Sequence, residues 1–358
     1  MKLTLSGSTF RDAIKASAVL FDAEIEVLAT ADPKSGRLIL ESGRNGIYCK
    51  QNLEADVIDA GQCVLAASHF SQISFQDQVS LESDSKHVSF KSGSFKGSLS
   101  CSTNTAPIES QRPEKIFKTA VTLPLDILRY ALAKVSFAGS IPGTQPGIRI
   151  QVKGDSLVLS TTDQYRATLF KESLPTHQGE FDILLSPSFL HTVLGRVNDS
   201  EVKLGADHGT FRLKSKSLDV FHPSIQTATE DIEEWISTGI DYESKKCGIK
   251  TTAEELTQAV RDVASIHIGA VAYDTYVEFL IKGNKAHLRC IADHGTAQTS
   301  LRVDSDVDKF ATKLSSKYTL EMLNLVKTGD ITIDFWDEFV LIYGQSKKFC
   351  ALIPTVAA

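Results

Sequence analysis

The feature that most constrains the fold is that the chain repeats itself. Three segments share one apolar pattern: "KLTLSGSTFRDAIKA" from Lys2, "AVTLPLDILRYALAK" from Ala120 and "CGIKTTAEELTQAVRD" from Cys247. Five apolar residues of the first segment recur in the second at a constant offset of 118 residues, and three recur in the third at an offset of 246. The positions are Leu3, Leu5, Phe10, Ala13 and Ile14, then Val121, Leu123, Leu128, Ala131 and Leu132, then Leu256, Ala259 and Val260. Such a repeat predicts several copies of one structural unit.

Each copy has the pattern of a short strand followed by a helix. Apolar residues at i, i+3 and i+4 predict a helix with one buried face. Small polar residues, Ser8 and Thr252, stand where an N-cap is expected, and Pro124 suits a first helical turn.

A second strand–helix pattern also occurs three times. Its copies are "QCVLAASHFSQISF" from Gln62, "FDILLSPSFLHTVL" from Phe181 and "ATKLSSKYTLEMLN" from Ala311, and each is followed by alternating segments typical of hairpins. The prediction is an α+β fold of three similar domains, 1–117, 118–243 and 244–358, each with two strand–helix–strands units. The polar linkers are 104–115 and 227–246.

Composition excludes several classes of protein. The chain has 358 residues, 42% apolar and 23% charged, and no apolar run long enough to span a membrane. Its N-terminus lacks the apolar core of a signal peptide, so we expect a cytoplasmic protein. The six cysteines lack zinc spacing and are expected to act as small apolar residues. Because the sequence has no phosphate loop and no metal-ligand set, we expect no cofactor and no metal.

Charge is distributed unevenly along the sequence. The six predicted helices, 8–21, 68–75, 124–138, 187–197, 252–267 and 316–327, carry eight basic and six acidic residues, whereas the whole chain has a net charge of −6. The pattern indicates a mildly positive helical surface against an acidic remainder, although helix ends attract Lys and Arg for ordinary reasons.

Together with the repeats, three short motifs resemble the bacterial β-type DNA polymerase III sliding clamps. The family's Thr-Asp-Gly-His-Arg-Leu-Ala motif corresponds to "TDQYRAT" from Thr162, its Phe-Pro-Asp-Tyr turn to "HPSI" from His222, and its Met-Pro-Met-Arg tail to "IPTV" from Ile353. The resemblance covers the whole chain. Its substitutions indicate a divergent member, either phage-encoded or from an outlying lineage.

The resemblance implies a nucleoid-associated, DNA-binding protein of replication that catalyses no reaction. Family members are head-to-tail homodimers whose helices line a ring, and they act as processivity factors on double-stranded DNA with the replicative polymerase and a clamp loader. By this resemblance Ile266 lies in the dimer interface. The candidate DNA-facing residues are Arg11, Lys15, Arg129, Lys134, Arg196, Arg261, Lys317 and Lys327.

The resemblance also implies a groove for partner peptides between the second and third domains. Its candidate residues are Thr162, Gln164, Tyr165, Arg166, Ala167, Gln145, Pro223, Thr227, Ala228, Ala351, Leu352, Ile353, Pro354, Thr355 and Val356. The family's Gly-His-Arg-Leu becomes Gln-Tyr-Arg-Ala here, and the tail loses its basic residue and both thioethers. We therefore expect an altered peptide preference.

Other interpretations stay open at this point. Asp163 and Arg166, with His177 or His191, could belong to an α+β enzyme. A turn organised by Asp163 is favoured, because Asp293 stands at the matching repeat position and a catalytic acid is rarely duplicated there. The "ADHG" segments at 206–209 and 292–295 fit either metal binding or turns. Trp235 fits either a partner anchor or the packing of an acidic loop. A two-domain trimeric clamp is disfavoured because three repeats are present.

Overall fold

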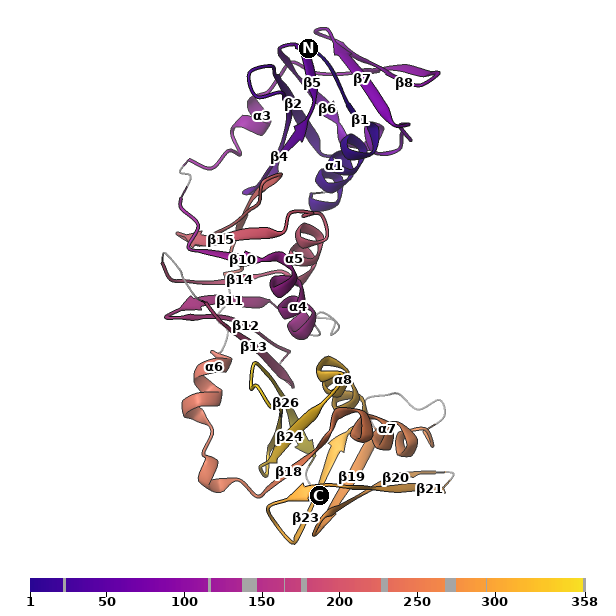
Figure 1. The fold of residues 1–358 in the computed structure, drawn as a ribbon, viewed down its shortest axis with the longest axis vertical. Helices are drawn as coiled ribbons and strands as arrows, with labels where there is room; N and C mark the ends of the chain where they lie inside the picture. Colours follow the sequence, from indigo (N-terminus) through magenta and orange to yellow (C-terminus); the bar gives the residue numbers. More distant parts are fainter. Residues whose placement is uncertain are drawn as a thin grey trace. The chain divides into compact units, whose positions relative to one another are not determined.

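The computed structural model describes residues 1–21, 24–114, 117–136, 147–163, 165–174, 179–226, 231–267, 275–293 and 295–356. The chain divides into two compact units (Figure 1). The first contains Met1–Arg129 and Thr176–Gln226, and the second contains Tyr130–Pro175 and Thr227–Ala358. The division into three domains by sequence repeat stays a prediction.

The first unit begins with a strand and a helix that many short antiparallel strands follow. Its amino-terminal elements are β1 (Lys2–Ser6), α1 (Gly7–Leu20), β2 (Glu26–Asp32), β3 (Arg37–Arg44), β4 (Ile47–Glu54), β5 (Asp56–Asp59), β6 (Gly61–Ala66), α2 (Ala67–Ser71), β7 (Gln78–Ser83), β8 (His87–Ser92), β9 (Phe95–Ser100) and α3 (Ala106–Glu109). The later elements are β10 (Val121–Pro124), β14 (Phe181–Leu185), α5 (Pro187–Leu194), β15 (Glu201–Asp207), β16 (Thr210–Lys214) and β17 (Leu218–Pro223). Helix α4 (Leu125–Val135) crosses the boundary between the two units.

The second unit has the same kinds of element. It contains β11 (Ile148–Lys153), β12 (Ser156–Thr162), β13 (Ala167–Ser173), α6 (Ile232–Glu234), a π-helical turn (Trp235–Gly239) and a 3₁₀ turn (Tyr242–Ser244). These are followed by β18 (Cys247–Thr252), α7 (Ala253–Ala264), β19 (Tyr276–Lys282), β20 (Lys285–Ala292), β21 (Gly295–Arg302), β22 (Asp304–Ser305), β23 (Lys309–Ser315), α8 (Ser316–Val326), β24 (Asp330–Phe335), β25 (Phe339–Gly344) and β26 (Phe349–Val356).

The predicted repeat is confirmed in the positions of the helices. Helices α1, α4 and α7 begin at Gly7, Leu125 and Ala253, which are separated by the same offsets that align their sequences. All thirteen apolar residues that define the repeat are buried. The fold is α+β with antiparallel strand pairing, as the alternating segments indicate.

Two details of the helix starts differ from the prediction. The N-cap of α1 is Ser6, whose hydroxyl accepts a hydrogen bond from the Thr9 amide, and Ser8 lies inside the helix. Pro124 is the last residue of β10 and precedes α4 directly, so it stands one position before the expected first turn. Thr252 caps α7 as predicted, accepting from the Glu255 amide at 3.2 Å.

Each unit joins strands from distant parts of the chain edge to edge. In the first unit β17 pairs with β4, within the order β10-β15-β16-β17-β4-β3-β2-β6. In the second unit β13 pairs with β26, within the order β11-β12-β13-β26-β23-β19-β20-β21. We call the β17–β4 contact the first junction and the β13–β26 contact the second junction.

The interiors match the composition. Five of the six cysteines are buried and Cys101 is half-buried, in keeping with small apolar residues in strands. None of the helices in the described part of the chain has the length and apolarity needed to cross a membrane.

Candidate functional site

The turn between β12 and β13 is organised by one carboxylate. Asp163 Oδ1 accepts hydrogen bonds from the amides of Tyr165, at 3.2 Å, and Arg166, at 2.9 Å. The Asp163 amide donates to the Arg166 carbonyl at 3.1 Å. An Asp that binds backbone amides two and three residues ahead is a turn-forming group. The prediction that Asp163 organises this turn is confirmed.

The same carboxylate holds the Arg166 side chain. Asp163 Oδ2 accepts from Arg166 Nε at 2.8 Å and Nη2 at 2.7 Å, and Nη1 forms an ion pair with Glu321 of α8. The guanidinium lies over the Tyr318 ring at 4.6 Å. Asp163 is 1% exposed and Arg166 is 3% exposed. The charge of Arg166 is therefore balanced inside the protein, and the pair fixes the strand ends rather than offering a free acid or base.

A pocket of about 230 Å³ lies beside this turn, within the second unit. It contains seven of the residues predicted for the groove: Thr162, Tyr165, Arg166, Ala167, Leu352, Ile353 and Pro354. Strand pairing explains this, because β13 and β26 are neighbours with Ala167 opposite Leu352. The two motifs, "TDQYRAT" and the carboxyl-terminal "IPTV", are nearly two hundred residues apart in sequence. The structure thus brings residues of both into one concave surface.

The other predicted groove residues lie elsewhere or outside the described part of the chain. Ala351 is fully buried on β26, and Thr355 and Val356 continue that strand along β23. Pro223 ends β17 in the first unit. Four lie outside the described residues: Gln145, Gln164, Thr227 and Ala228.

Four residues of the pocket are not among the predicted groove residues: Ile232, Trp235, Glu338 and Phe339. Trp235 and Phe339 have ring centroids 5.1 Å apart, and Phe339 stacks on Trp336 at 4.8 Å. The Trp336 indole donates to the Asp241 carbonyl at 2.9 Å, which fixes the stack to the 231–246 segment. The signal available in the sequence was Trp235 itself, an aromatic residue in an acidic stretch.

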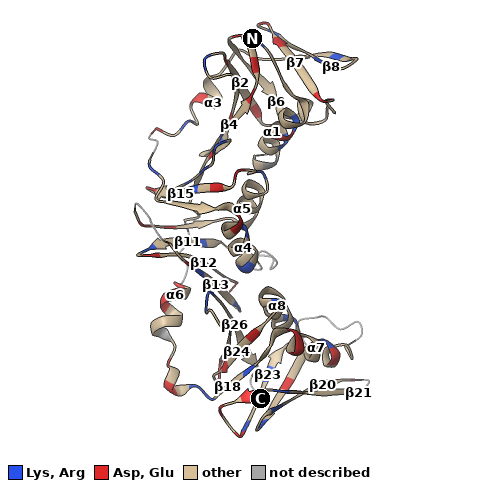
Figure 2. Cartoon of the chain, in the orientation of Figure 1, with Lys and Arg blue, Asp and Glu red and all other residues tan. Residues whose placement is uncertain are grey.

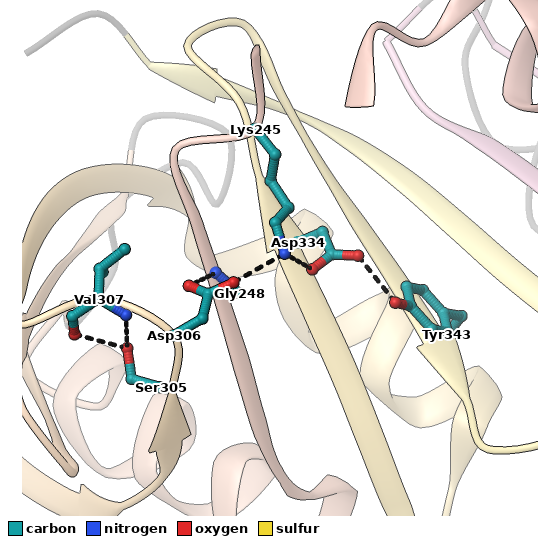
Figure 3. Close-up of polar contacts among 7 residues, drawn as sticks. All are labelled: Lys245, Gly248, Ser305, Asp306, Val307, Asp334 and Tyr343. Carbon is teal, nitrogen blue, oxygen red and sulfur yellow. Dashed lines mark hydrogen bonds and ion pairs between the residues drawn. The ribbon is translucent and has the colours of Figure 1, made fainter. Parts of the chain in front are cut away.

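A charged cluster anchors the same segment to the sheet (Figure 3). Lys245 Nζ lies 2.7 Å from an oxygen of Asp306 and 3.2 Å from one of Asp334, and the Tyr343 hydroxyl donates to Asp334 at 2.8 Å. Burial opposes the ammonium, but its bonds to both carboxylates raise the pKa of Lys245. A Cβ at Gly248 would lie within 2.9 Å of all three charged groups, so a larger residue there would displace the cluster.

The candidate DNA-facing residues differ in exposure. Arg129, Arg196, Arg261 and Lys327 are exposed, whereas Arg11, Lys15 and Lys317 are half-buried. Arg129 donates to the Leu194 and Val197 carbonyls at 2.7 Å, and Arg261 donates to Asn324 at 3.0 Å. Figure 2 shows acidic as well as basic residues on the helices, most clearly on α7.

Lys134 does not fit the expectation of an accessible DNA-facing residue. It is 5% exposed, its ammonium donates to the Leu325 carbonyl near the end of α8, and it lies 4.9 Å from the Tyr130 ring centroid. Burial lowers the pKa of Lys134. The sequence places this lysine on a helix but does not show that α8 covers it.

The "ADHG" segment at 206–209 is a hairpin turn. Asp207 pairs with Thr210 between β15 and β16, and His208 and Gly209 have φ values of 46° and 74°. Both angles suit a two-residue hairpin turn. In the second copy Ala292 pairs with Gly295, and His294 lies outside the described residues. Among the residues that the structure describes, no group of His, Cys, Asp or Glu is arranged to hold a metal ion.

Comparison with proteins of known structure reveals the same fold. The chain aligns over 99% of its length with a putative DNA polymerase III beta subunit of Eubacterium rectale, with a TM-score of 0.82, 14% identity and 99% of that chain covered. It aligns over its full length with the DNA polymerase III subunit beta of Pseudomonas aeruginosa, with a TM-score of 0.82, 12% identity and 100% of that chain covered. The DNA polymerase sliding clamp of Bacillus subtilis gives a TM-score of 0.81 and 16% identity, with 100% and 99% of the two chains covered.

Sequence comparison gives a weaker match, to a protein of the same kind. No protein-family profile matches the chain. The curated "Beta sliding clamp" of Streptomyces coelicolor is 26% identical over an alignment of 144 residues that covers 37% of this chain and 36% of that protein. The match therefore spans about a third of the curated relative. The resemblance predicted from the sequence is confirmed in the fold, and the low identities agree with a divergent chain.

Proposed function

We propose that this chain, which has the fold of the bacterial DNA polymerase sliding clamps, is a DNA polymerase processivity factor that catalyses no reaction. Two copies form a ring around duplex DNA, slide along it and hold the replicative polymerase and a clamp loader through peptide segments. The observation that carries the proposal is the structural match over the whole chain, which includes every repeat rather than one unit.

The ends of the sheets support a head-to-tail dimer. Strand β9 ends the order β5-β1-β7-β8-β9 in the first unit, and β21 ends the sheet of the second unit. Edge strands offer backbone groups for pairing with another chain. Pairing of β9 with β21 of a second copy joins two different surfaces, and such a heterologous contact closes into a ring when its rotation permits. Half-buried Ile266 lies beside Gly295, the first residue of β21, which supports its proposed place in this interface.

Sliding on DNA requires phosphate contacts without base readout. Basic side chains held in place by backbone carbonyls suit this task. They offer positive charge to the phosphates, which are the same in every DNA sequence, and they read no bases. The exposed candidates Arg129, Arg196, Arg261 and Lys327 are favoured over buried Lys134 as DNA contacts. A role of Asp163 and Arg166 in an enzyme is disfavoured, because their groups are bound to each other and to the turn.

The pocket beside Tyr165 supports the peptide groove. It is smaller than the roughly 300–1,000 Å³ of pockets that enclose a drug-sized ligand, so it suits one or two side chains of an extended peptide. Its apolar wall comes from Leu352, Phe339 and Trp235.

The test is topological. The protein is loaded onto nicked circular DNA with a clamp loader, the circle is cut, and DNA-bound protein is measured by gel filtration. A sliding ring dissociates through the free ends, so the bound fraction falls to background after cutting. Retention on linear DNA would contradict the ring, as would a monomer of 39.1 kDa at all concentrations in sedimentation.

A further inference from the structure

The accessible charge at the pocket beside Tyr165 is negative. Of the two charged residues that line it, Arg166 is bound to Asp163 and Glu321, whereas Glu338 is exposed. Glu234 of α6, between pocket residues Ile232 and Trp235, is also exposed. Figure 2 shows acidic residues along α6.

Two basic side chains near the pocket have acidic partners of their own. Lys171 lies 2.6 Å from Glu233, and Lys246 lies 3.2 Å from Asp337. The opposite charges within each pair largely cancel. The carboxylates of Glu338 and Glu234 therefore make the electrostatic potential at the pocket negative for an approaching peptide.

The same pocket presents aromatic surface to solvent. Tyr165 is 57% exposed and Trp235 is 36% exposed, whereas Trp336 beneath Phe339 is only 4% exposed. Exposed Trp and Tyr rings on a rigid support are typical anchors of binding surfaces. The faces of Trp and Tyr also attract cations.

We propose that this pocket binds a peptide in which an apolar or aromatic anchor is flanked by lysine or arginine. The anchor packs on Trp235, Phe339 and Leu352, and the cationic side chain lies at Glu338, against the ring of Trp235 or Tyr165. The proposal rests on the proposed function, because it names the chemistry of the peptide that this groove accepts. A peptide with acidic flanks is disfavoured by the same carboxylates.

The test uses fluorescein-labelled peptides of one Gly-Ser host sequence containing X-Leu-Phe-X, in which X is Lys, Gln or Glu. Fluorescence anisotropy with the full chain measures Kd for each. An exposed ion pair contributes modestly, so the Lys peptide is expected to bind about two- to five-fold more tightly than the Gln peptide, and the Glu peptide least tightly. The preference should weaken as salt is raised.

Variants locate the effect. Glu338→Gln should bring the Lys and Gln peptides close to equal affinity, and Glu338→Lys should reverse the order. Glu243→Gln, at an exposed glutamate of the 231–246 segment that does not line the pocket, is the control and should leave the order unchanged. Trp235→Ala should raise the Kd of all three peptides about ten-fold.

The two tryptophans give a second readout. Because Trp336 is buried, a change of tryptophan emission on peptide binding should come from Trp235 and disappear in Trp235→Phe. Equal affinities for the three peptides, tighter binding of the Glu peptide, or no binding of any peptide would overturn the proposal. Loading and sliding on circular DNA are measured separately with Glu338→Lys. Normal sliding with an altered peptide order separates this proposal from the proposed function, and failure of the wild-type chain to slide refutes only the latter.

Discussion

At the first junction β17 pairs with β4, at the second β13 pairs with β26, and each contact consists of four residue pairs. The first junction is filled. Tyr48 and Phe221 are 5% and 2% exposed, and Phe117 packs against Phe221 at 5.8 Å. The second junction has Tyr165 and Trp235 at its surface, 57% and 36% exposed, with a pocket between them.

Each junction holds a buried arginine in place with a carboxylate. Arg212 binds Asp219 at 2.8 and 2.7 Å and lies over Phe221, and Arg166 binds Asp163 at similar distances and lies over Tyr318. The difference arises from side chains rather than backbone pairing. The same edge-to-edge contact becomes a filled joint or a binding pocket, depending on whether aromatic residues point into the joint or out of it.

The largest contrast is expected from removing one aromatic residue at each junction. Phe221→Ala should lower the free energy of unfolding by about 3–5 kcal/mol, because it leaves a cavity in a packed joint. Tyr165→Ala should change it by less than about 0.5 kcal/mol, because the ring is exposed. Urea denaturation followed by circular dichroism measures both. Similar losses in the two variants would mean that the second junction also depends on its aromatic surface for stability.

A smaller contrast is expected between the two carboxylates that hold these arginines. Asp163→Ala should cost about 3–5 kcal/mol, because it leaves a buried arginine with one partner fewer and two amides of the turn without their acceptor. Asp219→Ala should cost about 1–2 kcal/mol less, because Asp219 has no comparable turn bonds to lose. The shift of Tm gives the order. Asp207→Ala, in an exposed hairpin, is the control and should be nearly neutral. The reverse order of Asp163 and Asp219 would contradict the turn role.

The smallest contrast concerns how far two surface segments, 104–114 and 231–246, loosen at low pH. Burial opposes ionisation of Glu41, but hydrogen bonds from Arg112 and Tyr48 lower the pKa of its carboxyl. Burial likewise opposes Asp306, while Lys245 lowers the pKa of that carboxyl. A depressed folded-state pKa gives stability that is present above the unfolded value and is lost as pH falls through the folded value.

Both anchors should therefore hold at pH 7 and weaken below their ordinary pKa values of 4.5 and 3.8. Hydrogen exchange of residues 104–114 and 231–246, corrected for intrinsic rates, measures the loss. Lys245→Met should remove the acid response of 231–246 and leave that of 104–114 unchanged. Loss of the response at both segments would show that the two anchors are coupled.

Much of this structure could be predicted from the sequence. Local rules governed the repeat, the starts of α1, α4 and α7 to within a residue or two, the hairpin turn at His208 and the turn at Asp163. These features depend on residues a few positions apart, whose spacing already encodes helix, strand or turn. The error at Ser8 has the same origin, because Ser6, Ser8 and Thr9 all offer hydroxyls near one helix start.

The sequence by itself determined the repeated units, their buried faces and the resemblance that names the fold. Only the tertiary structure decided that Lys134 is buried under the end of α8, and that Trp235, Glu338 and Phe339 share a pocket with Tyr165. The physical reason is that periodicity reports which face of an element is buried, but not which distant segment covers it. The exposure of a charge or an aromatic ring depends on that covering segment.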